Sequence, residues 1–472
     1  MRILLPFLVN AILNFIVGLV VAKLLGPAEY GRYALALSIG VVIQISLFEW
    51  LRLSALRFYS DHDRAERPDI RATLDVGFAA LAGLGVLVAA IVIFSGAPAP
   101  PSPELATLAI CAACANGAFD LSTAFARARF LDAAYGRLII VKNLLSFALT
   151  IGGAWYFGSA VAALAGLIVS AAGSVVLAGA PLRDPAARPG LARRATAGMF
   201  ATYALPIVAA NFMYQSIPML NRWLAAHEHD YAQAGQLALA FEIGLRVVGV
   251  IGSGLDVILF QLAVLREKTE GAESARAQVG RNGAIVLAIV LPVALGAFAV
   301  LPSFQALVVP EAYRGPFAHY FGLMTPALIA FALANYAVNP AFQIEQRTLP
   351  LVIAALVALI ADFAAIALLP HGADATVYAM AQSAASIAGL LALLVGAARI
   401  KGVWPRARDI LGACAAAAFM LACVWPLRAA SPGLLTLILQ AGLGAAAYAG
   451  VIAALDVAQL RTLVLRKLRK QG

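Results

Sequence analysis

Apolar tracts of about 20 residues, each long enough to cross a hydrocarbon core of about 30 Å as one helix, recur along the whole chain. Of the 472 residues, 62% are hydrophobic and only 12% are charged, which excludes a soluble enzyme. The tracts also lack the two-residue alternation, in pieces of about ten, that marks outer-membrane β-barrel strands. The sequence therefore predicts an all-α polytopic membrane protein.

Fourteen membrane-spanning segments are predicted. They cover residues 3–22, 33–53, 76–96, 105–126, 138–157, 159–180, 198–221, 235–264, 283–306, 318–342, 349–369, 375–398, 410–427 and 433–456. The first has no small-x-small cleavage site before Lys23, so we interpret it as a retained span rather than a signal peptide.

The distribution of positive charge predicts the topology. If the N-terminus and every even-numbered connection face the cytoplasm, that side holds 27 of the 34 Lys and Arg residues. Lys142 is counted with the connection after the fourth segment. The net charge of +10 then follows from the positive-inside rule and from contact with anionic lipid, and no nucleic-acid partner is expected. We expect both termini in the cytoplasm and the chain in a bacterial inner membrane.

A Pro- and Arg-rich link divides the predicted segments. We expect an N-terminal six-helix lobe at 1–182, a basic linker at 183–197, a C-terminal six-helix lobe at 198–398, and two extra helices with a basic tail at 399–472. The two lobes show a weak repeat, because the run from Gly31 to Ile39 resembles the run from Gly235 to Ile243. Internal repeats with a site at their interface are typical of secondary transporters.

Charged side chains within or next to the segments are the functional candidates, since an ionised group at mid-bilayer costs about 2.5–3.5 kcal/mol. The cations suit an anionic substrate, because guanidinium binds phosphate in a bidentate manner; they are Lys23, Arg52, Arg222 and Arg246. The carboxylates are candidates for ion coupling; they are Glu49, Glu242, Asp120 and Asp256. The alternatives are interfacial anchoring, pairing within one helix and helix packing.

No cofactor or metal is expected. The sequence has no phosphate-binding loop, so ATP is not a direct energy source within this chain. His227 and His229 lack metal-binding spacing, and Cys111 and Cys114 lie in an apolar tract, where packing is the simpler interpretation.

The run from Gly18 to Ala36, which contains Leu25-Gly26-Pro27-Ala28-Glu29-Tyr30-Gly31, resembles the first-loop signature of bacterial polysaccharide and lipid-linked oligosaccharide flippases of the multidrug/oligosaccharidyl-lipid/polysaccharide exporter superfamily. The resemblance implies two six-helix lobes forming a V around a central cavity that works by alternating access. It also implies an undecaprenyl-diphosphate-linked glycan as substrate, with membrane lipid and other polysaccharide assembly proteins as partners. No family motif surrounds Arg52, Arg222 or Arg246, so their assignment rests on their placement alone.

The leading hypothesis is therefore a non-enzymatic flippase for surface polysaccharide repeat units, destined for exopolysaccharide, capsule or the O-antigen of lipopolysaccharide. A related exporter of drugs or of the peptidoglycan lipid precursor is an alternative. A membrane-embedded polymerase or ligase is a weaker one, because no predicted loop is large enough to house its catalytic residues. The last hypothesis is a scaffold protein that transports no substrate.

Overall fold

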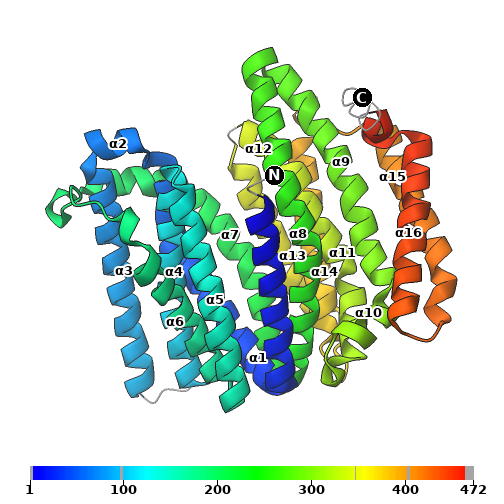
Figure 1. The fold of residues 1–472 in the computed structure, drawn as a ribbon, viewed down its shortest axis with the longest axis horizontal. Helices are drawn as coiled ribbons and strands as arrows, with labels where there is room; N and C mark the ends of the chain where they lie inside the picture. The colour runs from blue at the N-terminus through cyan, green and yellow to red at the C-terminus, as the bar shows by residue number, and fades with distance from the viewer. Residues whose placement is uncertain (1–3, 96–98, 346, 401–403, 463–472) are drawn as a thin grey trace. The chain divides into compact units, whose positions relative to one another are not determined.

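The computed structural model describes residues 4–95, 99–345, 347–400 and 404–462, and within these ranges every regular element is a helix (Figure 1). The longer helices are α1 (Leu4–Phe58), α3 (Pro68–Ser95), α4 (Pro103–Ala128), α5 (Asp132–Phe157), α6 (Ala160–Ala178), α7 (Arg194–Glu228), α8 (Tyr231–Glu270), α9 (Ala272–Ala299), α11 (Pro316–Leu333), α13 (Leu349–Leu368), α14 (Thr376–Ala397), α15 (Ala407–Val424) and α16 (Leu434–Leu455).

Shorter elements fill the connections. They are α2 (Asp61–Glu66), η1 (Ala180–Leu182), η2 (Pro189–Leu191), α10 (Leu301–Val308), η3 (Glu311–Tyr313), the π-helical turn η4 (Ala334–Val338), α12 (Asn339–Ile344), η5 (Trp425–Ala429) and η6 (Val457–Gln459).

The helices account for all fourteen predicted segments. Twelve helices in the described ranges are long and apolar enough to cross a membrane. Helix α1 contains the first two predicted segments, and α8, which is not among the twelve, coincides with the eighth. Large apolar side chains such as Phe94, Val176 and Leu368 are more than three-quarters exposed, as expected for lipid-facing positions. The chain is an all-α, multi-pass membrane protein.

The break between the first two segments lies at Gly26 and Pro27. Gly26 adopts φ 71° and ψ 172°, a conformation that is strained for residues with a Cβ, and Pro27 lacks the N–H that would continue the helix. The predicted loop at this position is therefore a single-residue break, and α1 resumes immediately after it.

The chain forms two compact units, residues 1–238 and 239–472. In unit 1, α1 packs on α4, α5 and α7, and α5 lies beside α6 (Figure 1). One hydrophobic core of unit 1 gathers around Leu51, Leu74 and Phe125. In unit 2, α13 packs on α14, and α15 packs on α9 and α16. The predicted lobe boundaries stay a prediction.

Candidate functional site

Unit 1 holds a charged network within its membrane-spanning helices. Arg52 and Glu49 lie one helical turn apart on α1, and the guanidinium donates to both carboxylate oxygens of Glu49, with Nε 2.8 Å from Oε2. Only 11% of the Glu49 side chain is exposed, against 31% for Arg52. The opposite charges of the pair neutralise each other and are joined by two hydrogen bonds. Pairing of this kind is how a membrane-embedded charge is normally tolerated.

The network continues onto α4 and α5. Gln44 of α1 donates to Asp120 of α4, with Nε2 2.6 Å from Oδ2. The Lys142 ammonium of α5 donates to Asn116 Oδ1 at 3.1 Å and lies 4.0 Å from the centroid of the Phe119 ring. Asp120 interacts electrostatically with both Lys142 and Arg52. Three helices thus share one set of charges and amides.

Lys142 is a functional candidate that the sequence analysis missed. The charge count placed Lys142 in a connection although it lies within the predicted segment 138–157. The structure confirms the segment, because α5 begins at Asp132 and Lys142 lies inside this helix, half-buried. Its acceptor lies 26 residues away on another helix, and no local pattern reveals that pairing.

The structure places the other predicted cations of unit 1 away from Arg52. Arg222 of α7 is 5% exposed and donates a hydrogen bond to the Ser38 hydroxyl of α1. Ser38 precedes Arg52 on α1 by four helical turns, about 20 Å at 1.5 Å per residue, so the two guanidiniums do not meet on one phosphate in this conformation. Lys23 is exposed near the Gly26 break.

The remaining predicted residues belong to unit 2. Glu242 and Arg246 lie one turn apart on α8 and both are half-buried. The side chain of Asp256 lies outside the described residues.

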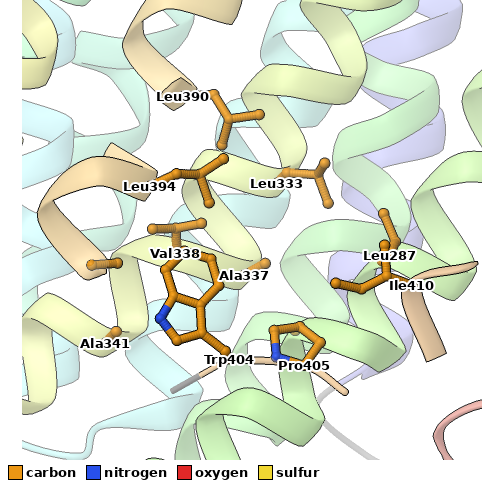
Figure 2. Close-up of a pocket in the computed structure, with 12 residues that line it drawn as sticks. Leu287, Leu333, Ala337, Val338, Ala341, Leu390, Leu394, Trp404, Pro405 and Ile410 are labelled. Carbon is orange, nitrogen blue, oxygen red and sulfur yellow. The ribbon is translucent and has the colours of Figure 1, made fainter. Parts of the chain in front are cut away.

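Unit 2 contains an apolar cavity of about 260 Å³ between α9, α14, α15 and the π-helical turn η4. Figure 2 shows the rings of Trp404 and Pro405 at one end of the cavity and Leu390 at the other. Ala337 and Val338 of η4 also line it. Single π-helical turns within α-helices often mark functional positions, and the lining is suited to a hydrocarbon chain.

At one end of unit 1, the backbones of α1 and α8 approach closely at Gly31 and Gly235. We call this end of the unit the glycine end. A Cβ on Gly235 of α8 would lie 2.9 Å from the backbone nitrogen of Gly31 and would overlap the carbonyl oxygen of Pro27. Reciprocally, a Cβ on Gly31 would overlap the carbonyl oxygen of Tyr231. The contact is symmetric, because each glycine meets the residue four positions before the other. The two glycines are the ones that the sequence repeat aligns.

Polar contacts surround this pair. Glu29 accepts from Arg32 at 3.0 Å and from the backbone N–H of Ala160 at 2.9 Å, which ties the turn after Gly26 to the start of α6. The Arg32 guanidinium lies 5.2 Å from the centroid of the Tyr231 ring, and the Tyr231 hydroxyl donates to the carbonyl of Pro101 at 3.2 Å. These contacts join α1 to the start of α6 and to α8, and they join α8 to the loop before α4.

The opposite end of unit 1, which we call the basic end, holds the linker after α6. Asp184, with a side chain only 2% exposed, accepts from Arg64 and from the Tyr59 hydroxyl, each at 2.9 Å. Burial alone would raise the pKa of Asp184, but these hydrogen bonds and the charge of Arg64 hold it below its usual value. Arg71 donates to the carbonyl of Leu182 at 3.0 Å, so the linker is fastened to unit 1.

The start of α7 is fastened in the same region. The Thr196 hydroxyl donates to Asp69 of α3 at 2.7 Å, and the backbone N–H of Arg193 donates to the Thr73 hydroxyl at 3.1 Å. Across the described ranges, no group of three or more His, Cys, Asp and Glu side chains is arranged to hold a metal ion.

The architecture is similar to that of three solved membrane proteins. The lipid II flippase MurJ, in its inward closed conformation, superposes with a TM-score of 0.77 over 98% of this chain and 100% of that chain, at 12% identity. An inward-facing multidrug resistance MATE family transporter of the MOP superfamily gives 0.53 over 84% of this chain and 95% of that chain, at 15% identity. The eukaryotic MATE transporter AtDTX14 gives 0.50 over 87% and 96%, at 12% identity.

No family model and no curated protein matches the sequence. The identities are low, so the comparison establishes the fold alone. The chain has the fold shared by the lipid II flippase MurJ and the MATE transporters.

Proposed function

We propose that this protein is a flippase. It moves undecaprenyl-diphosphate-linked oligosaccharide repeat units from the cytoplasmic to the periplasmic leaflet of a bacterial inner membrane, for surface polysaccharide synthesis. The observation that carries the proposal is the likeness to MurJ, named a lipid II flippase, over 98% of this chain, whereas the two MATE transporters match 84% and 87% with lower TM-scores. It needs neither catalysis nor a cofactor, and both termini lie in the cytoplasm.

The chemistry of the two units suits an amphiphilic anion. Arg52, Arg222, Arg246 and Lys23 are the proposed ligands for diphosphate and acidic sugars, since guanidinium pairs with phosphate oxygens. Glu49, Asp120, Glu242 and Asp256 are the proposed coupling groups, and Lys142 joins them because it lies within the electrostatic reach of Asp120. The apolar cavity of unit 2 supplies a surface that hydrocarbon prefers to water.

Alternating access requires the glycine end to open. In the proposed cycle, the contact between Gly31 and Gly235 closes the periplasmic side while substrate enters from the cytoplasm. Backbone packing of this kind suits a gate, because glycines let two helices approach closely.

Export of the peptidoglycan lipid precursor is the second candidate, favoured by the name of the MurJ structure itself. Mass spectrometry of the undecaprenyl-diphosphate pool in a strain deleted for this gene separates the two. Accumulation of a complete repeat unit, with surface polymer lost, supports the proposed function. Accumulation of the peptidoglycan precursor supports the second candidate. An unchanged pool shifts the weight to drug export, and single repeat units exposed to the periplasm indicate a polymerase or ligase.

Arg246 tests the proposed anion site. We expect Arg246→Ala to abolish export while the protein still inserts, because it removes a half-buried cation from α8. Arg246→Lys keeps the charge but loses bidentate geometry, and it should retain part of the activity. Normal export by Arg246→Ala would remove this residue from the site.

A further inference from the structure

A second cavity of unit 2 adjoins the apolar one and is polar. It has a volume of about 280 Å³ and is lined by Arg281 of α9, by Arg406 and Asp409 at the start of α15, and by the turn at Ala458 and Gln459. Trp404 lines both cavities, so the two share this residue. Arg281, Arg406 and Asp409 are not among the proposed diphosphate ligands or coupling groups, and they do not line the apolar cavity.

The charges of this polar cavity are only partly satisfied by the protein. Asp409 Oδ1 accepts from the backbone N–H of Ala458 at 2.9 Å. Within the described ranges, no hydrogen bond or ion pair engages the guanidinium of Arg281, which is half-buried, or that of Arg406, which is exposed. Two guanidiniums and one carboxylate leave the cavity one positive charge in excess.

The wall opposite the arginines is a fixed turn. Asp456, Ala458 and Gln459 all have left-handed φ values of 49–58°. Asp456 accepts from the Thr462 hydroxyl at 2.6 Å, and Asp409 holds Ala458 as described. The cavity is therefore shaped by backbone that side-chain hydrogen bonds hold in an uncommon conformation.

Along α9 and from the start of α15, the residues that line the cavities change from charged to apolar. On α9, Arg281 is followed by Gly283 and Leu287 of the apolar cavity, and around the start of α15, Arg406 is followed by Ile410. The polar cavity lies at the end of unit 2 that the positive-inside rule assigns to the cytoplasm. A polar compartment at the membrane surface thus leads into an apolar one toward the membrane interior.

We propose that the two cavities together form a binding site for an anionic phospholipid of the phosphatidylglycerol type from the cytoplasmic leaflet. Arg281 and Arg406 bind the phosphodiester, Asp409 accepts a hydrogen bond from a glycerol hydroxyl, and the first part of an acyl chain passes Trp404 into the apolar cavity.

Charge and size favour this occupant over the lipid-linked glycan. A single excess positive charge matches one phosphodiester, whereas a diphosphate would bring a second negative charge close to Asp409. A compartment of about 280 Å³ suits a phosphoglycerol headgroup, since pockets for whole drug-sized molecules start at about this size and an oligosaccharide is larger.

The test uses the full chain in phosphatidylcholine nanodiscs that contain a fixed fraction of phosphatidylglycerol with brominated acyl chains, which quench nearby tryptophan fluorescence. The chain has five tryptophans, so the Trp404 contribution is taken as the difference from Trp404→Phe. We expect brominated phosphatidylglycerol to quench this contribution more than equally brominated phosphatidylcholine or phosphatidylethanolamine. The assay has no transport step, so its result is independent of the proposed function.

The matched variants are R281Q/R406Q and R399Q/R461Q. The second pair removes two exposed arginines that line neither cavity. We expect the first pair to lose the preference for phosphatidylglycerol by about tenfold, the effect of one charge-assisted hydrogen bond on a binding constant, and the second pair to keep it. Arg406 is exposed, so R406Q alone tests the site should the double variant fail to fold.

Three results would overturn the proposal. Equal quenching by all three brominated phospholipids would mean that Trp404 faces ordinary boundary lipid. An equal loss in R399Q/R461Q would mean that general surface charge sets the preference. Displacement of brominated phosphatidylglycerol by undecaprenyl diphosphate at the same mole fraction would make the cavities part of the substrate pathway.

Discussion

At the glycine end of unit 1, Gly31 and Gly235 bring two helix backbones into contact, whereas at the basic end Asp184 and its partners fasten the linker through charged hydrogen bonds. The first contact depends on shape and the second on charge. Shape-dependent packing is lost abruptly when one methyl group is added, while a hydrogen-bonded carboxylate loses stability gradually with pH. The two ends therefore respond to different perturbations.

The difference also separates the moving part from the fixed part of unit 1 in the proposed cycle. The glycine end must open in that cycle, and its ion pair is partly exposed: the Arg32 side chain is 47% exposed in its pair with Glu29. Exposed pairs of this kind contribute about 0–1 kcal/mol. The basic end carries buried acceptors, so we expect it to stay closed around the linker throughout transport.

The largest effect is expected at the glycines. Gly31→Ala or Gly235→Ala places a methyl group against backbone atoms that cannot rotate away, and overpacking of this kind costs about 1–3 kcal/mol. We expect a lower unfolding midpoint in detergent and loss of export in cells, because the helices can no longer close.

The matched control is Gly152→Ala in α5, where an added Cβ meets nothing within 4 Å. Alanine is the better helix former by about 1 kcal/mol, so this variant should be neutral or slightly more stable and should export normally. If both kinds of substitution behave alike, the contact seen between Gly31 and Gly235 does not govern closure.

A smaller effect is expected at the basic end. Asp184→Asn keeps the shape but removes the charge that receives hydrogen bonds from Arg64 and Tyr59. Hydrogen bonds to a charged group contribute about 1.5–3 kcal/mol. Because Arg64 is 34% exposed and solvent screens it, we expect a total loss near the lower limit, about 1–2 kcal/mol in unfolding experiments.

Asp132→Asn serves as its control, since Asp132 is an exposed carboxylate at the same end and should change stability by less than about 0.5 kcal/mol. Asp184→Asn should leave export intact at moderate temperature, unlike the glycine variants. Loss of export without loss of stability would contradict the fixed role of the basic end.

Most of the fold is readable from the sequence because membrane-spanning helices must be long and apolar. All fourteen segments coincide with helices, and the break at Gly26 and Pro27 follows from their backbone chemistry. The error at Lys142 has the opposite origin. The charge count treated Lys142 as part of a connection because charges usually mark helix ends. Inside the helix it is stabilised by the side-chain oxygen of Asn116, the ring of Phe119 and the charge of Asp120, all supplied by another helix.

Less of the candidate site can be predicted from the sequence. The pairing of Glu49 with Arg52 follows from their spacing on one helix, but the burial of Arg222 against Ser38 depends on how α7 packs on α1. The repeat aligned Gly31 with Gly235, yet it carried no sign that they touch, because a repeat records equivalence and not proximity. The roles of the charged residues in substrate binding and ion coupling stay predictions.

The smallest effect is a pH dependence confined to the basic end. The pKa of Asp184 is held below its unfolded value of about 3.9, so its contribution to stability is complete above that value. The contribution is lost as the pH falls through the lower folded pKa, where the carboxyl takes up a proton and gives up its charged hydrogen bonds. The unfolding midpoints of the unmodified chain and of Asp184→Asn should therefore differ at pH 7, begin to converge only as the pH falls below about 4, and meet below the folded pKa of Asp184. Gly31→Ala contains no titrating change, so its deficit should stay constant over the same range. If the stability deficit of Asp184→Asn persists at the lowest pH, the asparagine disturbs packing rather than charge. Both ends would then depend on shape, and the contrast between them would be lost.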